Sequence, residues 1–165
     1  MTSSSAVICA TLTAAMLAIS CTPRFEVERL RTEFPAKSAE LNSIATACER
    51  SKLRWVGANG EHSQYIHAAT AEDLSAAAVI ATNLSAAGFI SAICGRSSQD
   101  QGRQMISVQV IAEAVGIAVS GSTAGYIRLA SHTGGRPGPE TPGFTFIPID
   151  SACNGMCWYV FTTSG

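Results

Sequence analysis

The pattern of apolar residues changes its period once along the chain, and this change limits the fold more than any other feature. From Val27 to Cys48, apolar residues recur at steps of three, four and seven, which is typical of an amphipathic helix. After Phe89, short β-branched and aromatic runs alternate with Gly, Pro and Ser clusters, which is typical of strands. Helices followed by strands predict an α+β domain, with two N-terminal helices packed on one face of a mainly antiparallel sheet of about five to seven strands.

The two helices carry different local signals. The first contains Pro35, so we expect either a kink there or a helix that restarts after Thr32 with Pro35 in its first turn. In the second, Thr70 and Asp73 resemble a capping box, and Gly88 suits the left-handed position that ends a helix. The face of this helix that we expect to be buried consists of Leu74, Ala77, Ala78, Ala81 and Leu84.

The strand predictions follow from short apolar runs between turn signals. They cover residues 53–56, 65–67, 89–94, 105–112, 115–120, 125–130, 144–149 and 157–162, with a turn at Asn59-Gly60. The run Gly121–Gly125 is similar to a nucleophile elbow, but Thr123 replaces the central Ser, so we interpret it as a hairpin connection. Alternation predicts Trp158 and Val160 on one face of the last strand, with Tyr159 and Phe161 on the other.

An uncharged apolar run occupies Ala6–Cys21 and ends where the chain turns polar. Its apolar core is shorter than the roughly 20 residues of a spanning helix and suits a secretory signal. With Ser20 before Cys21, it resembles the lipobox of bacterial lipoproteins. That resemblance implies a signal peptide at 1–20, lipidation of Cys21, and attachment to the membrane through this anchor, with a short tether at 21–24. Thr22 stands where an Asp would retain many lipoproteins at the inner membrane, so the resemblance favours the outer membrane, facing the periplasm.

Two departures from the lipobox pattern leave other destinations open. Residues 1–5 contain no Lys or Arg, and Ala18 stands at the third position before Cys21, where Leu is usual. The same segment is also compatible with cleavage that releases a soluble periplasmic or secreted protein, or with an uncut anchor.

Charge and length bound the remainder of the chain. Residues 21–165 suit a single domain with one core. All 11 Lys and Arg residues and all 12 Asp and Glu residues follow Pro23, so this part is close to neutral. A nucleic-acid-binding protein would show a basic excess and a clustered basic face, so we expect no nucleic-acid partner.

Cysteine usage agrees with export. Apart from Cys9 and Cys21, four cysteines remain, an even number that predicts two disulfides in an oxidising compartment. We favour Cys153 with Cys157, because Asn154-Gly155 forms a turn signal between them, and Cys48 with Cys94. Two buried free thiols are the alternative for Cys48 and Cys94. The spacing does not suit a zinc site, and we predict no metal and no cofactor.

A search for catalytic residues yields only scattered candidates. His62, His67 and His132 lack metal-ligand spacing and are interpreted as surface histidines, and the carboxylates Asp100 and Glu140 are isolated in the sequence. Arg136 lies in a Gly-rich loop without the Lys-Ser/Thr of a phosphate-binding loop. We name Tyr159 and Arg136 as candidate partner contacts, because Tyr and Arg are enriched at interfaces.

The order of elements resembles a group of small bacterial proteins that are lipid-anchored or exported and have no assigned activity. The resemblance covers the leading helix, Leu53–Gly57, the helix Thr70–Gly88, Gly125-Tyr126 and the final Trp158–Phe161. The leading hypothesis is a non-enzymatic envelope lipoprotein that acts by contact with a protein partner. A sharper form of it is an immunity-type inhibitor of a periplasmic toxin. The alternative is an envelope hydrolase or small-ligand-binding protein, with a site assembled from His67, His132, Arg128 and Glu113.

Overall fold

Two helices and seven strands make up the part of the chain that the computed structural model describes, which is residues 22–64, 69–95, 106–115, 122–130, 144–149 and 155–163. The helices are α1 (Thr22–Arg50) and α2 (Ala71–Ala87). The strands are β1 (Leu53–Gly57), β2 (His62–Gln64), β3 (Ser91–Cys94), β4 (Ile106–Val115), β5 (Ser122–Ala130), β6 (Phe144–Pro148) and β7 (Met156–Thr163).

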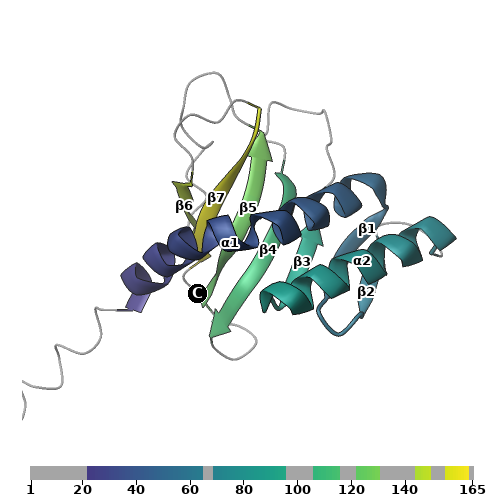
Figure 1. Ribbon diagram of the computed structural model, residues 1–165, viewed down its shortest axis with the longest axis horizontal. Helices are drawn as coiled ribbons and strands as arrows, with labels where there is room; N and C mark the ends of the chain where they lie inside the picture. Colours follow the sequence, from purple (N-terminus) through teal and green to yellow (C-terminus); the bar gives the residue numbers. More distant parts are fainter. Residues whose placement is uncertain are drawn as a thin grey trace, which may run out of the picture.

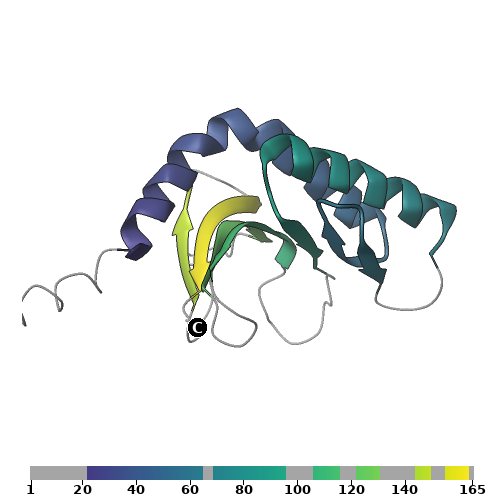
Figure 2. The same ribbon diagram turned by 90° about the horizontal axis from the view of Figure 1, so that it is seen from below.

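All seven strands belong to one antiparallel sheet with the order β2-β1-β3-β4-β5-β7-β6. Both helices lie on the same side of this sheet, as Figures 1 and 2 show. Helix α1 contacts β3, β4, β5 and β7, whereas α2 contacts β1 and β3 and runs beside α1. The predicted α+β fold is therefore confirmed, with two helices on one face of an antiparallel sheet.

Helix α1 is continuous through Pro35, so the helix does not restart there. Figure 2 shows that it changes direction along its length, as expected when proline removes one backbone donor. The predicted stripe is buried, with Leu30, Leu41 and Ile44 almost fully enclosed. Helix α1 begins at Thr22, so residues 22–24 of the predicted tether are helical, and the tether at 21–24 stays a prediction.

Helix α2 begins at the predicted capping box. The Thr70 hydroxyl accepts a hydrogen bond from the Asp73 N–H (3.1 Å), and the Asp73 carboxylate accepts one from the Thr70 N–H (3.1 Å). The other Asp73 oxygen accepts a hydrogen bond from the Lys52 N–H, at 2.8 Å. These bonds lower the pKa of Asp73, chiefly through the Lys52 N–H. The helix ends, as predicted, at Gly88 in the left-handed conformation.

The predicted buried face of α2 is partly wrong. Leu74 is 50% exposed, and Ala78 is also exposed. The buried residues are Asp73, Ala77, Ile80, Leu84 and Ala87. The hydrogen bond from Lys52 explains the difference, because it turns Asp73 toward the core. The next residue lies about 100° further around the helix, so Leu74 is turned outward.

Several strand bounds differ from the predictions. The return strand that pairs with β1 is His62–Gln64, whereas the predicted return strand 65–67 lies outside the described residues. Val115 is the last residue of β4, and the rest of the predicted strand 115–120 also lies outside them. The interpretation of Gly121–Gly125 as a hairpin connection is wrong for residues 122–125, which belong to β5.

Gly125 allows β4 and β5 to approach closely. A Cβ at this position would lie 2.0 Å from the backbone oxygen of Val110, well inside van der Waals contact. The pairing of β4 with β5 changes register next to this point, between Ile111 and Glu113. A side chain at Gly125 is therefore incompatible with the observed pairing.

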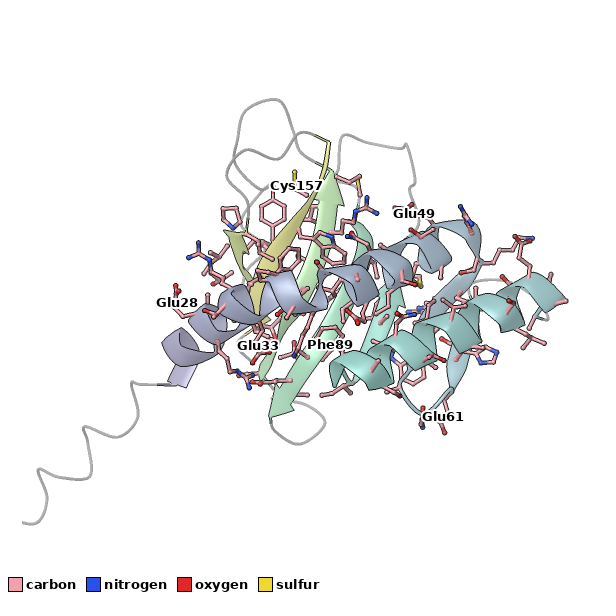
Figure 3. All side chains as sticks on the ribbon, in the orientation of Figure 1. Glu28, Glu33, Glu49, Glu61, Phe89 and Cys157 are labelled. Carbon is pink, nitrogen blue, oxygen red and sulfur yellow. A yellow bond between two sulfur atoms is a disulfide. The ribbon has the colours of Figure 1, made fainter. Side chains whose placement is uncertain are left out.

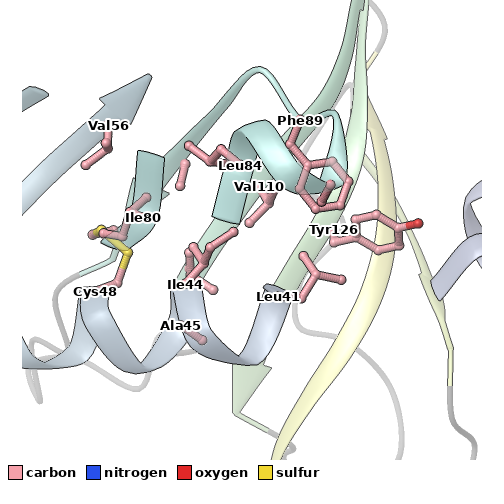
Figure 4. Packing of buried hydrophobic residues seen from close by; sticks show 14 of the residues in the cluster. Leu41, Ile44, Ala45, Cys48, Val56, Ile80, Leu84, Phe89, Val110 and Tyr126 are labelled. Atoms are coloured by element: carbon pink, nitrogen blue, oxygen red, sulfur yellow. A yellow bond between two sulfur atoms is a disulfide. The ribbon is translucent and has the colours of Figure 1, made fainter. Parts of the chain in front are cut away.

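Each face of the sheet carries its own apolar cluster. The larger cluster lies under the helices and includes the residues labelled in Figure 4, with Tyr126 at one end of the view. The Tyr126 hydroxyl donates a hydrogen bond to the Leu30 carbonyl of α1 at 2.7 Å, and burial raises the tyrosine pKa well above its ordinary value. The smaller cluster, which includes Tyr159 and Phe161, lies on the opposite face. The predicted alternation along the last strand is therefore confirmed.

The predicted disulfide between Cys48 and Cys94 is confirmed. It joins the last turn of α1 to β3, with the two Cα atoms 5.1 Å apart. Both cysteines are buried within the larger apolar cluster. Cys153 lies outside the described residues, so its predicted bond to Cys157 stays a prediction.

Candidate functional site

The described residues of the predicted catalytic set do not converge. The Arg128 guanidinium of β5 binds the Glu49 carboxylate of α1 at 2.8 Å, and Glu113 of β4 forms an ion pair with Arg29 of α1. Arg128 is paired in register with Val108, five residues before Glu113, which places the two side chains roughly 15 Å apart along β4. Each residue is thus held against α1 at its own point. His67 and His132, the other two members of the set, lie outside the described residues.

The remaining polar candidates give no site either. His62 is exposed on the short strand β2, with its Nδ1 3.2 Å from the Gly60 carbonyl oxygen. Thr123 Oγ1 lies 2.8 Å from Thr163 Oγ1, so this hydroxyl joins two strands of the sheet. Asp100 and Glu140 lie outside the described residues. Within the described ranges, no group of three His, Cys, Asp or Glu residues could hold a metal ion.

Tyr159 is buried, and its role as a partner contact stays a prediction. Its side chain is only 9% exposed and packs in the smaller apolar cluster, because the alternation of β7 turns it toward the face opposite the helices. Arg136 and Cys21, the other predicted contact and the predicted lipidation site, lie outside the described residues.

An ion-pair cluster lines the side of α1 that faces β4. The Lys37 ammonium contacts Glu33 at 2.7 Å and lies 5.1 Å from the centre of the Phe89 ring. The hydrogen bond from Lys37 lowers the pKa of Glu33. Because these charges are engaged with one another and with the core, they stabilise the packing of α1 on the sheet.

A concave surface lies between α1 and α2 in the part of the chain that the structure describes. It is an open groove of about 610 Å³. Its floor is formed by the least exposed lining residues, which are Ser43 and Ala47 of α1 and Ala76 of α2. The other lining residues are exposed: Asn42, Thr46 and Arg50 from α1, and Glu72, Ser75 and Val79 from α2. Figure 3 shows the two helices that form it, running side by side on the surface of the molecule.

Small and uncharged side chains dominate the surface around this groove. No charged residue occurs between Leu74 and Ala87, although half of this helix faces solvent. Leu74 and Val79 are among the large apolar side chains that remain exposed, at 50% and 42%. A surface helix normally carries charged residues on its outer face, so their absence here distinguishes α2 from an ordinary covering helix. This gap in the charge pattern is a sequence signal that could have marked the outer face of α2, although not the groove itself.

No protein-family model, no curated protein and no solved structure matches this chain. Neither described helix combines the length and the apolar character of a membrane span. The described residues form an α+β domain with a disulfide in its core and an open groove between its two helices.

Proposed function

We propose that this protein is exported, anchored to the cell envelope by lipid on Cys21, and active there through contact with a protein partner. The observation that carries the proposal is the Cys48–Cys94 disulfide in the core. Disulfides of this kind form and persist in oxidising compartments and are rare in the cytosol. The apolar segment Ala6–Cys21, with its resemblance to a lipobox, supplies the route to such a compartment.

The anchor and the helix form one continuous unit in this proposal. Cys21 directly precedes Thr22, where α1 begins, so no described loop separates the lipidated residue from the helix. Each buried methylene of an acyl chain contributes about 0.8 kcal/mol, and two chains suffice for stable attachment. The helix would then hold the sheet and the groove at a set distance from the membrane. The outer membrane, facing the periplasm, is the location we propose.

Contact with another protein accounts for the surface better than catalysis does. The groove is open, its floor is made of small side chains, and the exposed side of α2 carries no charge after Asp73. Such a surface loses little hydration when a partner covers it. The alternative, an envelope hydrolase or ligand-binding protein, required His67, His132, Arg128 and Glu113 to meet in one site. The two that the structure describes, Arg128 and Glu113, bind different parts of α1. An immunity-type inhibitor of a periplasmic toxin is the sharper form of the contact proposal.

The anchor is tested by replacing Cys21 with Ser in the full chain. Cells expressing each variant are labelled with radioactive palmitate and then separated into membrane and soluble fractions. We expect the native chain to carry label and to stay with the membranes, and Cys21→Ser to lose both the label and the processing to a shorter mass. Cys9→Ser, which changes a cysteine of the same apolar segment, is the matched control and should behave like the native chain. Label retained by Cys21→Ser would show that the anchor has been assigned to the wrong residue.

A further inference from the structure

The groove between α1 and α2 is open and is lined by residues of both helices. The two helices lie side by side and run in opposite directions, as both ribbon views show. Asn83 of α2 donates a hydrogen bond to the Ser43 hydroxyl of α1 at 3.2 Å, which marks one level of the pair. The groove extends along α1 from Asn42 to Arg50, a rise of about 12 Å or two helical turns. Its floor of small side chains permits another helix to approach closely, because interaxial distance depends on the side chains at the contact.

A helix suits this groove better than an extended segment. The backbone groups of α1 and α2 are already bonded within their own helices, so neither offers a row of donors and acceptors to a strand. An extended segment laid here would leave its own backbone N–H and C=O groups without partners when water is excluded. A helix satisfies those groups internally and presents only side chains.

Two charged residues at one end of the groove indicate the chemistry of that helix. Arg50 and Glu72 both line the groove and are exposed, and neither forms a hydrogen bond or ion pair with another residue of the described segments. Ser43 of α1 lies opposite Asn83 of α2, and the two helices are antiparallel. Arg50, seven residues after Ser43, therefore lies at the level of Ala76, seven residues before Asn83. Glu72 lies one turn beyond that level, about 6 Å further along the groove. Two residues four positions apart on a helix lying in the groove are also separated by about 6 Å, so they match the spacing of Arg50 and Glu72.

We propose that the groove binds an α-helix of the partner protein that carries an acidic residue for Arg50 and a basic residue for Glu72, one turn apart. The face of that helix toward Ala47 and Ala76 consists of small, uncharged side chains. This inference rests on the proposed function, since it names the surface through which the protein contacts its partner. Two turns of helix bury less area than a standard interface, so the complex is transient unless flanking surfaces also engage.

The test introduces the photoreactive residue p-benzoylphenylalanine at Ser75, in the groove, within the full chain in living cells. The control position is Thr145, which is exposed on the distant edge strand β6. After irradiation, mass spectrometry identifies the protein and the residue attached to each position. We expect Ser75 to yield an adduct within a helix of another protein that has an acidic and a basic residue one turn apart.

The charges are then reversed. Arg50→Glu should lower the yield of the Ser75 adduct about fivefold, the effect of one surface ion pair of about 1 kcal/mol. Changing the partner's acidic residue to Lys should restore the yield. Arg31→Glu is the matched control, because Arg31 is an exposed arginine of α1 outside the groove, and it should leave the yield unchanged. An unchanged unfolding midpoint of Arg50→Glu would show that the variant still folds.

The outcomes separate this inference from the function on which it rests. Adducts with another protein from Thr145 but none from Ser75 would show that the groove is not the binding site, and would leave the contact function in place. No adduct from either position would overturn both. A Ser75 adduct with a second copy of this chain, or one that Arg50→Glu does not weaken, would overturn the proposed occupant.

Discussion

Replacing both Cys48 and Cys94 with Ala should lower the free energy of unfolding by about 4 kcal/mol. The two residues are 46 positions apart, and the bond between them closes a loop of that length in the unfolded chain. The chain-entropy relation gives about 13 cal/mol/K for such a loop, which is about 4 kcal/mol at 25 °C. Both sulfur atoms are buried, so the Ala side chains also leave part of the core unfilled, and this adds to the loss.

The loss is measured by urea unfolding of the purified full chain without reductant, followed by tryptophan fluorescence. In a thermal scan we expect the midpoint to fall by roughly 10 °C. A reductant is then added to the native chain and to the double variant. In the native chain the reductant breaks every disulfide, whereas in the double variant it acts only on the other cysteines. The difference between the two losses of unfolding free energy therefore reports the Cys48–Cys94 bond alone. If the double variant unfolds within about 1 kcal/mol of the native chain, the entropic reasoning is refuted. Alkylation of Cys48 and Cys94 before reduction would refute the bond itself.

Two further predictions concern the backbone and the helix cap. Gly125→Ala should lower the free energy of unfolding by about 2 kcal/mol or more, because its Cβ would collide with the Val110 carbonyl; an unchanged urea midpoint would contradict this. The pKa of Asp73 is lowered in the folded chain, so its stabilising effect is complete above its ordinary value of about 3.9 and is lost as the pH falls below that value. Unfolding measured from pH 7 to pH 2 should therefore show a steeper acid loss in the native chain than in Asp73→Asn, and equal slopes would refute the assignment.

Much of the fold could be predicted because local signals and the final packing agree. The stripe of α1, the cap at Thr70, the left-handed Gly88 and the alternation of β7 each depend on residues a few positions apart. The pairing of Cys48 with Cys94 was predictable for another reason. A turn signal favoured the pairing of Cys153 with Cys157, which left Cys48 and Cys94 for each other.

The candidate site could not be predicted in the same way. Nothing in the order of residues indicates that Thr46 and Ser75 line one groove, because they are brought together only when α1 and α2 pack antiparallel. Tyr159 shows the same limit from another side. Its residue type favours an interface, whereas only the packing of the sheet places it in the smaller apolar cluster.

By itself, the sequence determined the class of fold, the positions of most helices and strands, and the apolar segment that ends at Cys21. The period of apolar residues and the chemistry of turns and caps act over a few residues, so they can be read directly from the chain. Tertiary structure alone decided how α2 is rotated, which charges are paired and where a groove opens. Those features depend on contacts between distant residues, such as the hydrogen bond from Lys52 to Asp73, and no local preference of α2 could anticipate that bond.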